Sequence, residues 1–365
     1  MIKIIGRRIL SLINPRYSYL PQIEEYDNLS QDFALYSMFT HTKNFSGNHI
    51  TTDNYGFRYS EFKNKLISLE TELFSQKKIN LIIGGSTVFG VGASNDKNTI
   101  SSLLSKTSNE RWINLGLRAG NSFQEYINLI KVLGKIKNID KIIFLSGIND
   151  IYISLLFGKT HNNLDDLIFD NSKIEDFLNS YSLKKYSFIK QIIAFILSSI
   201  KNENINDLIR HKSFSKMIKF KSSKHLINKN VAKTNFEKMY SNFERNFLLY
   251  SALENKLINT KITFFLQPYF SWTNKQPNIK ENEIFEFNKL NFESSSRIHK
   301  KMNQGVYLKI NKFLKELSLK YGLNFYDLNT EKYGSKEDFI FADSVHLTDE
   351  GNMMVSNHIF KNIYT

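Results

Sequence analysis

The chain has no cysteine among its 365 residues, which excludes disulfides, thiolate metal sites and a cysteine nucleophile. Only four prolines are present, too few to mark a linker between domains. No apolar run reaches the length of about 20 residues that a membrane-spanning helix needs. We therefore expect one large domain, with no second independent domain beside it.

The charge balance is basic, with 49 Lys and Arg against 35 Asp and Glu and a net charge of +14. Such a balance is typical of proteins that bind nucleic acid, an anionic membrane or an acidic polymer. The lysines are scattered, however, and no nucleic-acid-binding motif is present, so we expect no nucleic-acid partner. Hydrophobic residues make up 41% of the chain, enough for a sizeable core.

The N-terminal segment MIKIIGRRILSLINPRYSYL is basic and only briefly apolar. Its apolar part, residues 9–13, is too short for the core of a signal peptide, and no small-residue cleavage site follows. We therefore expect a cytoplasmic protein. Two roles stay open for the segment: it packs on its own domain, or it lies as an amphipathic helix on the inner face of the membrane, a peripheral contact.

Strand patterns alternate with helix patterns from residue 76 onward. The predicted strands are Ile79–Ile83, Arg111–Leu115, Lys141–Leu145, Lys261–Leu266 and Asn324–Leu328. The predicted helices are Thr99–Lys106, Ser122–Ile136, Asn235–Leu257, Tyr307–Tyr321 and a last helix that Thr348 caps. This alternation predicts an α/β fold with a doubly wound parallel sheet.

Two regions interrupt this rhythm. Residues 1–75 contain few strong strand signals, and we predict an N-terminal extension that packs on the core domain, residues 76–365. Residues 151–234 are much longer than an ordinary crossover, and we predict a helical insertion there. The insertion either covers the active site as a cap or has no role in the chemistry, and both readings stay open.

A serine follows the first predicted strand, where the apolar run LII ends in Gly84, Gly85 and Ser86. The segment GGSTVFGVGAS lacks the lysine of a P-loop, the third glycine of a dinucleotide fingerprint and the second glycine of the Gly-x-Ser-x-Gly elbow. In open α/β sheets, ligands bind at the carboxyl ends of the strands. Ser86 is therefore placed as a nucleophile, and a serine nucleophile needs a base.

A base is present near the C-terminus, in the segment FADSVHLTDEGN. Asp343 and His346 stand three residues apart in a loop that leads into a helix, so the carboxylate can reach the Nδ1–H of the imidazole. The Nε2 atom is then available for the proton of Ser86. This spacing predicts a Ser–His–Asp triad.

Two further segments can supply hydrogen-bond donors for an oxyanion. The segment GIND follows the third strand, and the side-chain amide of Asn149 can donate there. The segment NLGLRAGNS follows the second strand, and the backbone N–H of Gly116 or of Gly120 can do the same. The residues themselves do not decide between these two glycines.

The four segments GGST, NLGLRAGNS, GIND and DSVH resemble, in this order, the four blocks of the SGNH/GDSL hydrolase family. The resemblance implies a flavodoxin-like, three-layer α/β/α fold with five parallel strands, and acyl transfer through a serine ester without metal or cofactor. The site residues that it implies are Ser86, Asp343 and His346 for catalysis, and Ser86, Gly120 and Asn149 for the oxyanion hole. Where the family has Asp before the nucleophile, this chain has Gly85.

The segments DNYGFR and FLQPYF resemble stretches beside this core in bacterial family members linked to cell-surface polysaccharides. We therefore expect an esterase that removes an acetyl or another small acyl group from a glycan or a small ester. An O-acyltransferase that uses the same serine is the first alternative, and a non-catalytic glycan-binding module is the second. Within FLQPYF, Gln267 and Pro268 either contact the substrate or serve the structure.

Overall fold

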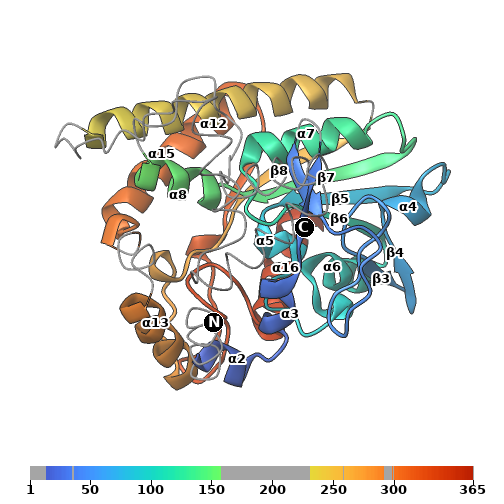
Figure 1. Ribbon diagram of the computed structural model, residues 1–365. Helices are drawn as coiled ribbons and strands as arrows, with labels where there is room; N and C mark the ends of the chain where they lie inside the picture. Colours follow the sequence, from blue (N-terminus) through green and yellow to red (C-terminus); the bar gives the residue numbers. More distant parts are fainter. Residues whose placement is uncertain are drawn as a thin grey trace, which may run out of the picture. The chain divides into compact units, whose positions relative to one another are not determined.

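Five parallel strands form the central sheet of the protein (Figure 1). They are β5 Ile79–Gly84, β6 Arg111–Gly116, β7 Ile139–Ser146, β8 Lys261–Leu266 and β9 Asn324–Asp327. Their order is β6-β5-β7-β8-β9, and each neighbouring pair is parallel. The predicted α/β fold class with five parallel strands is confirmed.

The computed structural model describes residues 14–34, 37–157, 231–257, 259–291, 298 and 300–364. All of them belong to one of the two compact units into which the chain divides. The other unit, residues 1–11 and 169–229, lies outside the described residues.

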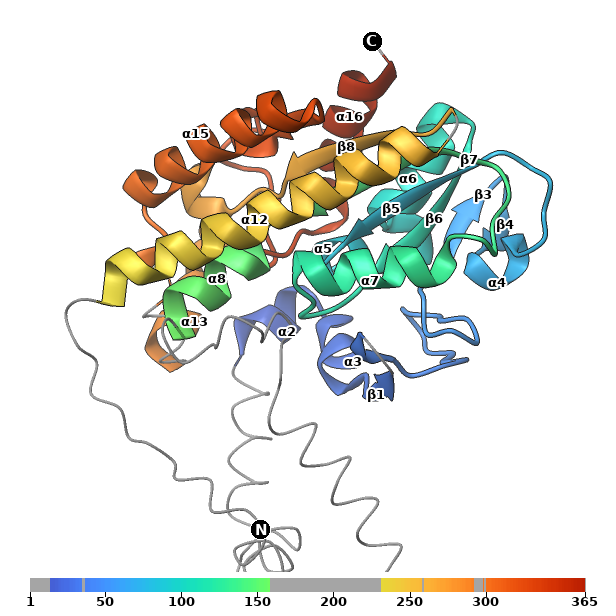
Figure 2. The same ribbon diagram turned by 90° about the horizontal axis from the view of Figure 1, so that it is seen from above.

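Helices cover both faces of the sheet (Figure 2). One face carries α7 Ser122–Val132, α8 Ile148–Phe157, α12 Val231–Lys256 and α15 Gln304–Tyr321. The other carries α5 Ser86–Phe89, α6 Ile100–Ser108 and α16 Asp349–Tyr364. Successive residues of β5 serve opposite faces, because Leu81 and Ile83 pack in one core cluster and Ile82 packs in the other. The core is therefore the three-layer sandwich that the sequence predicts.

The predicted helices are all present, with shifted ends. The helix α7 stops at Val132 instead of Ile136, and α12 already begins at Val231. Thr348 caps α16 as predicted, since its hydroxyl accepts a hydrogen bond from the N–H of Gly351 at 3.2 Å. The other described elements that follow β5 in the chain are α13 Ile279–Asn291 and the short 3-10 turns Asp96–Asn98, Phe270–Trp272 and Leu328–Thr330.

The N-terminal region contains two small antiparallel ribbons that its sequence signals only weakly. They pair β1 Gln31–Ala34 with β2 Met38–His41, and β3 Ser60–Phe62 with β4 Lys65–Ile67. Its helices are α2 Pro15–Tyr19, α3 Ile23–Asn28 and α4 Leu69–Glu72. Buried side chains of this region, among them Ile23 and Tyr26, share a core cluster with Phe89 and Val91. The predicted domain boundaries themselves stay a prediction.

Most of the predicted insertion, residues 151–234, lies outside the described residues, so its role as a cap stays a prediction. The same holds for residues 1–13 and for the membrane contact expected of them. Within the described ranges, no helix is long and apolar enough to span a bilayer.

Candidate active site

Ser86 lies where the strand order reverses. The strand β5 has β6 on one side and β7 on the other. The chain therefore continues from β5 to β6 on one side, and then crosses to β7 on the other side of β5. Open α/β sheets bind their ligands at this switch point. A Cβ atom on Gly84 would lie 2.1 Å from the carbonyl oxygen of Leu145, which explains the glycine at the end of β5. Ser86 is then the first residue of α5.

The structure brings Ser86, His346 and Asp343 into one hydrogen-bonded chain. The Nε2 atom of His346 lies 2.7 Å from the Oγ of Ser86, although the two residues are 260 positions apart. The Nδ1 atom of His346 lies 2.7 Å from the Oδ2 of Asp343. With Nδ1 protonated toward the carboxylate, Nε2 is the acceptor for the hydroxyl proton of Ser86.

The loop that carries Asp343 and His346 is folded around the carboxylate. The Oδ1 atom of Asp343 accepts the backbone N–H of Val345 at 2.9 Å and that of His346 at 2.8 Å. The N–H of Ala342 donates to the carbonyl oxygen of His346 at 2.9 Å, which closes the loop. Asp343 therefore fixes both the backbone and the ring of His346.

Asp343 remains charged despite its burial. Desolvation by itself would raise its pKa, but the neighbouring charges of His346 and Arg16 and the hydrogen bonds from His346 outweigh it. The pKa of Asp343 therefore lies well below its usual range. The guanidinium of Arg16 reaches the Oδ2 of Asp343 at 2.8 Å.

Arg16 is a site residue that the sequence reasoning missed. It lies on α2, whose N-terminus is capped by the side chain of Asn14 and has Pro15 in its first turn. The Asn-Pro pair is a recognisable helix start and could have predicted this short helix. No local pattern in the sequence links Arg16 to the loop of Asp343, which lies more than about 300 residues later in the chain.

Gln267 ties three segments of the site together. Its Nε2 donates to the hydroxyl of Thr87 at 2.7 Å, and it lies 3.5 Å from the carbonyl oxygen of Val345. Its backbone N–H donates to Ser146 at the end of β7. These contacts hold the residue after Ser86 against the loop of His346, and they favour the structural role among the two left open for Gln267.

The predicted oxyanion donors differ in how they are placed. The N–H of Ser86 opens a helix, so it has no intrahelical acceptor. The amide of Asn149 lies against the serine turn, because a Cβ atom on Gly85 would be 2.8 Å from its Nδ2. That Nδ2 donates one hydrogen bond to the carbonyl oxygen of Gly120, at 2.7 Å, and carries a second N–H.

Both candidate glycines use their N–H groups elsewhere in this conformation. The N–H of Gly120 donates to the carbonyl oxygen of Leu117 at 3.0 Å. The N–H of Gly116 donates to the side chain of Asn114 at 2.9 Å. Gly116 also lies so close to α5 that a Cβ atom would be 2.2 Å from the backbone nitrogen of Phe89. Gly116 thus has a packing reason of its own, and the role of Gly120 stays a prediction.

Two buried carboxyl groups lie close to the serine turn: a Cβ atom on Gly85 would be 3.9 Å from the Oε1 of Glu125, and Asp150 follows Asn149 on α8. Burial raises the pKa of Asp150 to about 6, although Ser122 donates to this carboxylate through both its N–H and its hydroxyl. Burial and then the charge of Asp150 raise the pKa of Glu125 well above its usual range. Burial therefore favours the neutral form of Glu125, which places no negative charge beside a forming oxyanion.

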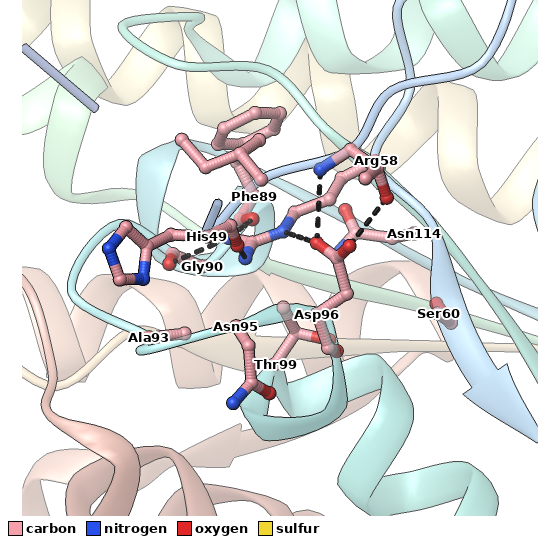
Figure 3. Close-up of polar contacts among 12 residues, drawn as sticks. His49, Arg58, Ser60, Phe89, Gly90, Ala93, Asn95, Asp96, Thr99 and Asn114 are labelled. Atoms are coloured by element: carbon pink, nitrogen blue, oxygen red, sulfur yellow. Dashed lines mark hydrogen bonds and ion pairs between the residues drawn. The ribbon is translucent and has the colours of Figure 1, made fainter. Parts of the chain in front are cut away.

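The other end of α5 is held by a second arginine (Figure 3). The Nη1 of the fully buried Arg58 donates to the carbonyl oxygens of Phe89 and Gly90, both at 3.0 Å. Its Nε donates to the Oδ1 of Asp96 at 2.7 Å, and its Nη2 donates to the carbonyl oxygen of His49 at 2.8 Å. A cation at a helix C-terminus satisfies the last carbonyls and complements the dipole, so α5 is anchored behind Ser86.

Within the described part of the chain, no group of three or more His, Asp or Glu side chains could hold a metal ion. We therefore assign no metal-binding residues.

Comparison with known proteins gives similarity of fold only. No family model matches the chain, and no curated protein matches it. Among solved structures, a lipolytic protein of the G-D-S-L family from Veillonella parvula is 10% identical, with 79% of this chain and 99% of that one covered and a TM-score of 0.37.

An acetyl xylan esterase from Geobacillus stearothermophilus is 13% identical, with 79% of this chain and 95% of that one covered and a TM-score of 0.35. An α/β hydrolase from a Lake Arreo metagenome is 10% identical, with 78% and 94% covered and a TM-score of 0.37. At these scores the likeness carries no argument about activity, which has to come from the side-chain geometry.

Proposed function

We propose that the protein hydrolyses carboxylic esters through an acyl-serine intermediate. The observation that supports this best is the continuous hydrogen-bonded chain from Asp343 through His346 to Ser86. Each of its two links measures 2.7 Å, and the chain ends at the switch point of the sheet.

In the first half-reaction, Nε2 of His346 takes the hydroxyl proton while the Oγ of Ser86 bonds to the ester carbonyl carbon. The tetrahedral intermediate then collapses, the bond to the alcohol oxygen breaks, and His346 gives its proton to that oxygen. In the second half, water loses a proton to His346 and attacks the acyl-serine. Ser86 leaves with that proton, and the carboxylic acid is released.

The negative charge of the tetrahedral intermediate needs donors at the turn after β5. We propose the N–H of Ser86 and the second amide N–H of Asn149 for this role. The N–H of Gly120 joins them when substrate draws it from the carbonyl oxygen of Leu117 or divides it between the two acceptors. Catalytic hydrogen bonds often tighten only when substrate is bound.

The proposed substrate class is a carbohydrate that carries acetyl or another short acyl group. This part of the proposal comes from the motif resemblance, which includes segments like those of family members linked to surface polysaccharides. Transfer of the acyl group to a glycan hydroxyl uses the same acyl-serine, with the hydroxyl in the place of water. The two reactions therefore share every step up to the acyl-enzyme.

The test compares the wild type with Ser86→Ala on p-nitrophenyl acetate and on longer acyl esters. We expect kcat/KM to fall by at least about 10³-fold, because the nucleophile is lost while the fold stays intact. Ser94→Ala is the matched control, since its hydroxyl bonds to Asp349 and not to His346. Both variants should show the wild-type circular dichroism spectrum.

A fluorophosphonate separates the alternatives. Turnover and labelling that both depend on Ser86 support the esterase. Labelling of Ser86 without turnover, followed by turnover when a glycan acceptor is added, indicates the acyltransferase. A wild type with neither turnover nor labelling contradicts the acyl-serine chemistry and leaves the binding module. Full activity in Ser86→Ala contradicts it as well.

A further inference from the structure

An arginine from the N-terminal region enters the proposed catalytic chain. Arg16 places its Nη2 2.8 Å from the Oδ2 of Asp343, and this same oxygen lies 2.7 Å from the Nδ1 of His346. The pair is shielded from solvent, since the side chains of Arg16 and Asp343 are 15% and 13% exposed. Screening by water is weak at such burial, so the guanidinium charge acts on both partners.

The position of Arg16 is not explained by stability alone. Its Nε is buried without a hydrogen-bond partner among the described residues, which costs desolvation energy. Asp343 already has three other donors in its own loop, the N–H of Val345, the N–H of His346 and the ring of His346. The arginine therefore adds a charge to a carboxylate that the loop alone would satisfy.

We propose that Arg16 is a positioning residue, which holds the Oδ2 of Asp343 and sets the pH range over which His346 is the neutral base that activates Ser86. This inference rests on the proposed function. A positive charge beside Asp343 disfavours a second positive charge on the imidazole ring. Removal of the Arg16 charge is therefore expected to make protonation of the ring more favourable.

Other ionisable groups near the chain do not reproduce this effect. Tyr269, in the loop after β8, is electrostatically coupled to Asp343 and to Tyr152 of α8, and burial raises its pKa well above the usual range, so it stays neutral. Glu125 of α7 lies near the serine turn, because a Cβ atom on Gly85 would be 3.9 Å from its Oε1. Burial raises the pKa of Glu125 well above its usual range, which favours the neutral form. Burial raises the pKa of Asp150 to about 6, but Asp150 belongs to a different cluster, with Ser122 and Asn246.

The experiment follows the ring of His346 by NMR, in the wild type and in three Arg16 variants. Arg16→Met removes the charge and keeps an unbranched apolar side chain, Arg16→Gln keeps an N–H donor without charge, and Arg16→Lys keeps the charge. The ring signal is assigned by its loss in His346→Gln. Arg111→Met is the matched control, because Arg111 is the first residue of β6, at the amino end of the strand, and pairs there with Glu72.

We expect the titration midpoint of the ring to rise by about 0.5–1 pH unit in Arg16→Met and Arg16→Gln. It should stay near the wild-type value in Arg16→Lys and Arg111→Met. The acidic limb of kcat/KM on p-nitrophenyl acetate should move by the same amount. A midpoint unchanged in both neutral variants overturns the proposal, and so does an equal rise in Arg16→Lys.

The two readouts separate this inference from the proposed function. Lack of ester turnover in the wild type contradicts the esterase, yet the NMR midpoint still decides whether Arg16 controls His346. If Arg16→Met does not fold, Arg16→Gln carries the same test, because it retains a hydrogen bond to Asp343.

Discussion

Two arginines of the N-terminal region each pair with a carboxylate of the core, and they differ in burial and in what they contact. Arg58 is fully buried, and its guanidinium binds Asp96 at 2.7 Å. Arg16 remains 15% exposed and binds Asp343 at 2.8 Å. The same ion-pair chemistry therefore occurs once inside the scaffold and once at the proposed catalytic chain.

The Arg58 pair is part of a closed network (Figure 3). Each nitrogen of its guanidinium donates to a protein oxygen, and its charge also lies over the rings of Tyr26 and Phe89 at 5.2 and 5.6 Å. Asp96 in turn accepts the hydroxyl of Thr51 at 2.5 Å. Removal of one partner leaves the other charge buried and unpaired, and this lowers the free energy of unfolding strongly.

The ion pair of Arg16 and Asp343 is partly exposed to solvent, and Asp343 has other hydrogen-bond donors. If Arg16 is lost, Asp343 keeps its hydrogen bonds from the backbone and from His346. A buried arginine whose contacts no other residue can replace thus stabilises the fold. An arginine beside a carboxylate that already accepts enough hydrogen bonds instead changes the electrostatic environment of the neighbouring ionisable groups.

The largest difference is expected when the same change, Asp→Asn, is made in each pair. Asp343→Asn should lower kcat/KM by about 10²–10⁴-fold, because the ring of His346 loses the carboxylate that orients it and stabilises its charged form. Asp96→Asn should leave the activity of the folded protein near wild type and lower the free energy of unfolding by about 2–4 kcal/mol. Ester kinetics and urea denaturation on both variants measure these effects.

The two Asp→Asn variants serve as controls for each other. A comparable rate loss in Asp96→Asn, with folding intact, would show that the Arg58 network also acts on catalysis through α5. The separation of the two regions would then be wrong.

A smaller contrast is expected for Arg→Met. Arg58→Met leaves Asp96 buried without its cation, so the free energy of unfolding should fall by about 3–5 kcal/mol. Arg16→Met should cost only about 1–2 kcal/mol, because one charged hydrogen bond is lost and Asp343 keeps the others. Urea denaturation at pH 7 measures both, and equal losses would contradict the ranking.

The sheet and the triad were predictable because their signals are local. Each strand of the sheet is a short apolar run that ends in glycine or polar residues, as in LIIGGS. The hydrophobic pattern and the residues that end the run therefore identify the strand. The DSVH segment combines an acid and a histidine at a spacing that a loop can close. These segments can be placed at one edge by the rule that the carboxyl ends of parallel strands lie at the same edge of the sheet.

The contacts of the N-terminal region were not predictable in the same way. Strands β1 to β4 are only three or four residues long, too short for a clear alternating pattern. The partners of Arg16 and Arg58 come from tertiary packing. No spacing rule joins Arg58 to Asp96, 38 positions later, or Arg16 to Asp343 near the other end of the chain. Arg58 belongs to the DNYGFR segment, and nothing in that segment identifies the partners of this arginine.

The smallest expected effect concerns the pH dependence of stability. It compares Asp343, where neighbouring charges and hydrogen bonds outweigh burial, with Asp150, where burial outweighs them. The pKa of Asp343 is lowered on folding, so its contribution to stability is present above the unfolded value of about 4 and is lost as the pH falls below it. The pKa of Asp150 is raised to about 6, so folded Asp150 keeps a proton that the unfolded chain releases between about pH 4 and 6.

The stability difference between wild type and Asp→Asn should therefore change with pH in opposite directions at the two sites. For Asp343→Asn, the advantage of the wild type should shrink between about pH 4 and 2.5. For Asp150→Asn, the wild type should lose about 1–3 kcal/mol relative to the variant as the pH rises from about 4 to 6. Urea denaturation at half-unit pH steps gives both curves. Parallel curves would mean that burial outweighs the charges of His346 and Arg16 and the hydrogen bonds from His346 at Asp343, as burial outweighs the favourable contacts at Asp150.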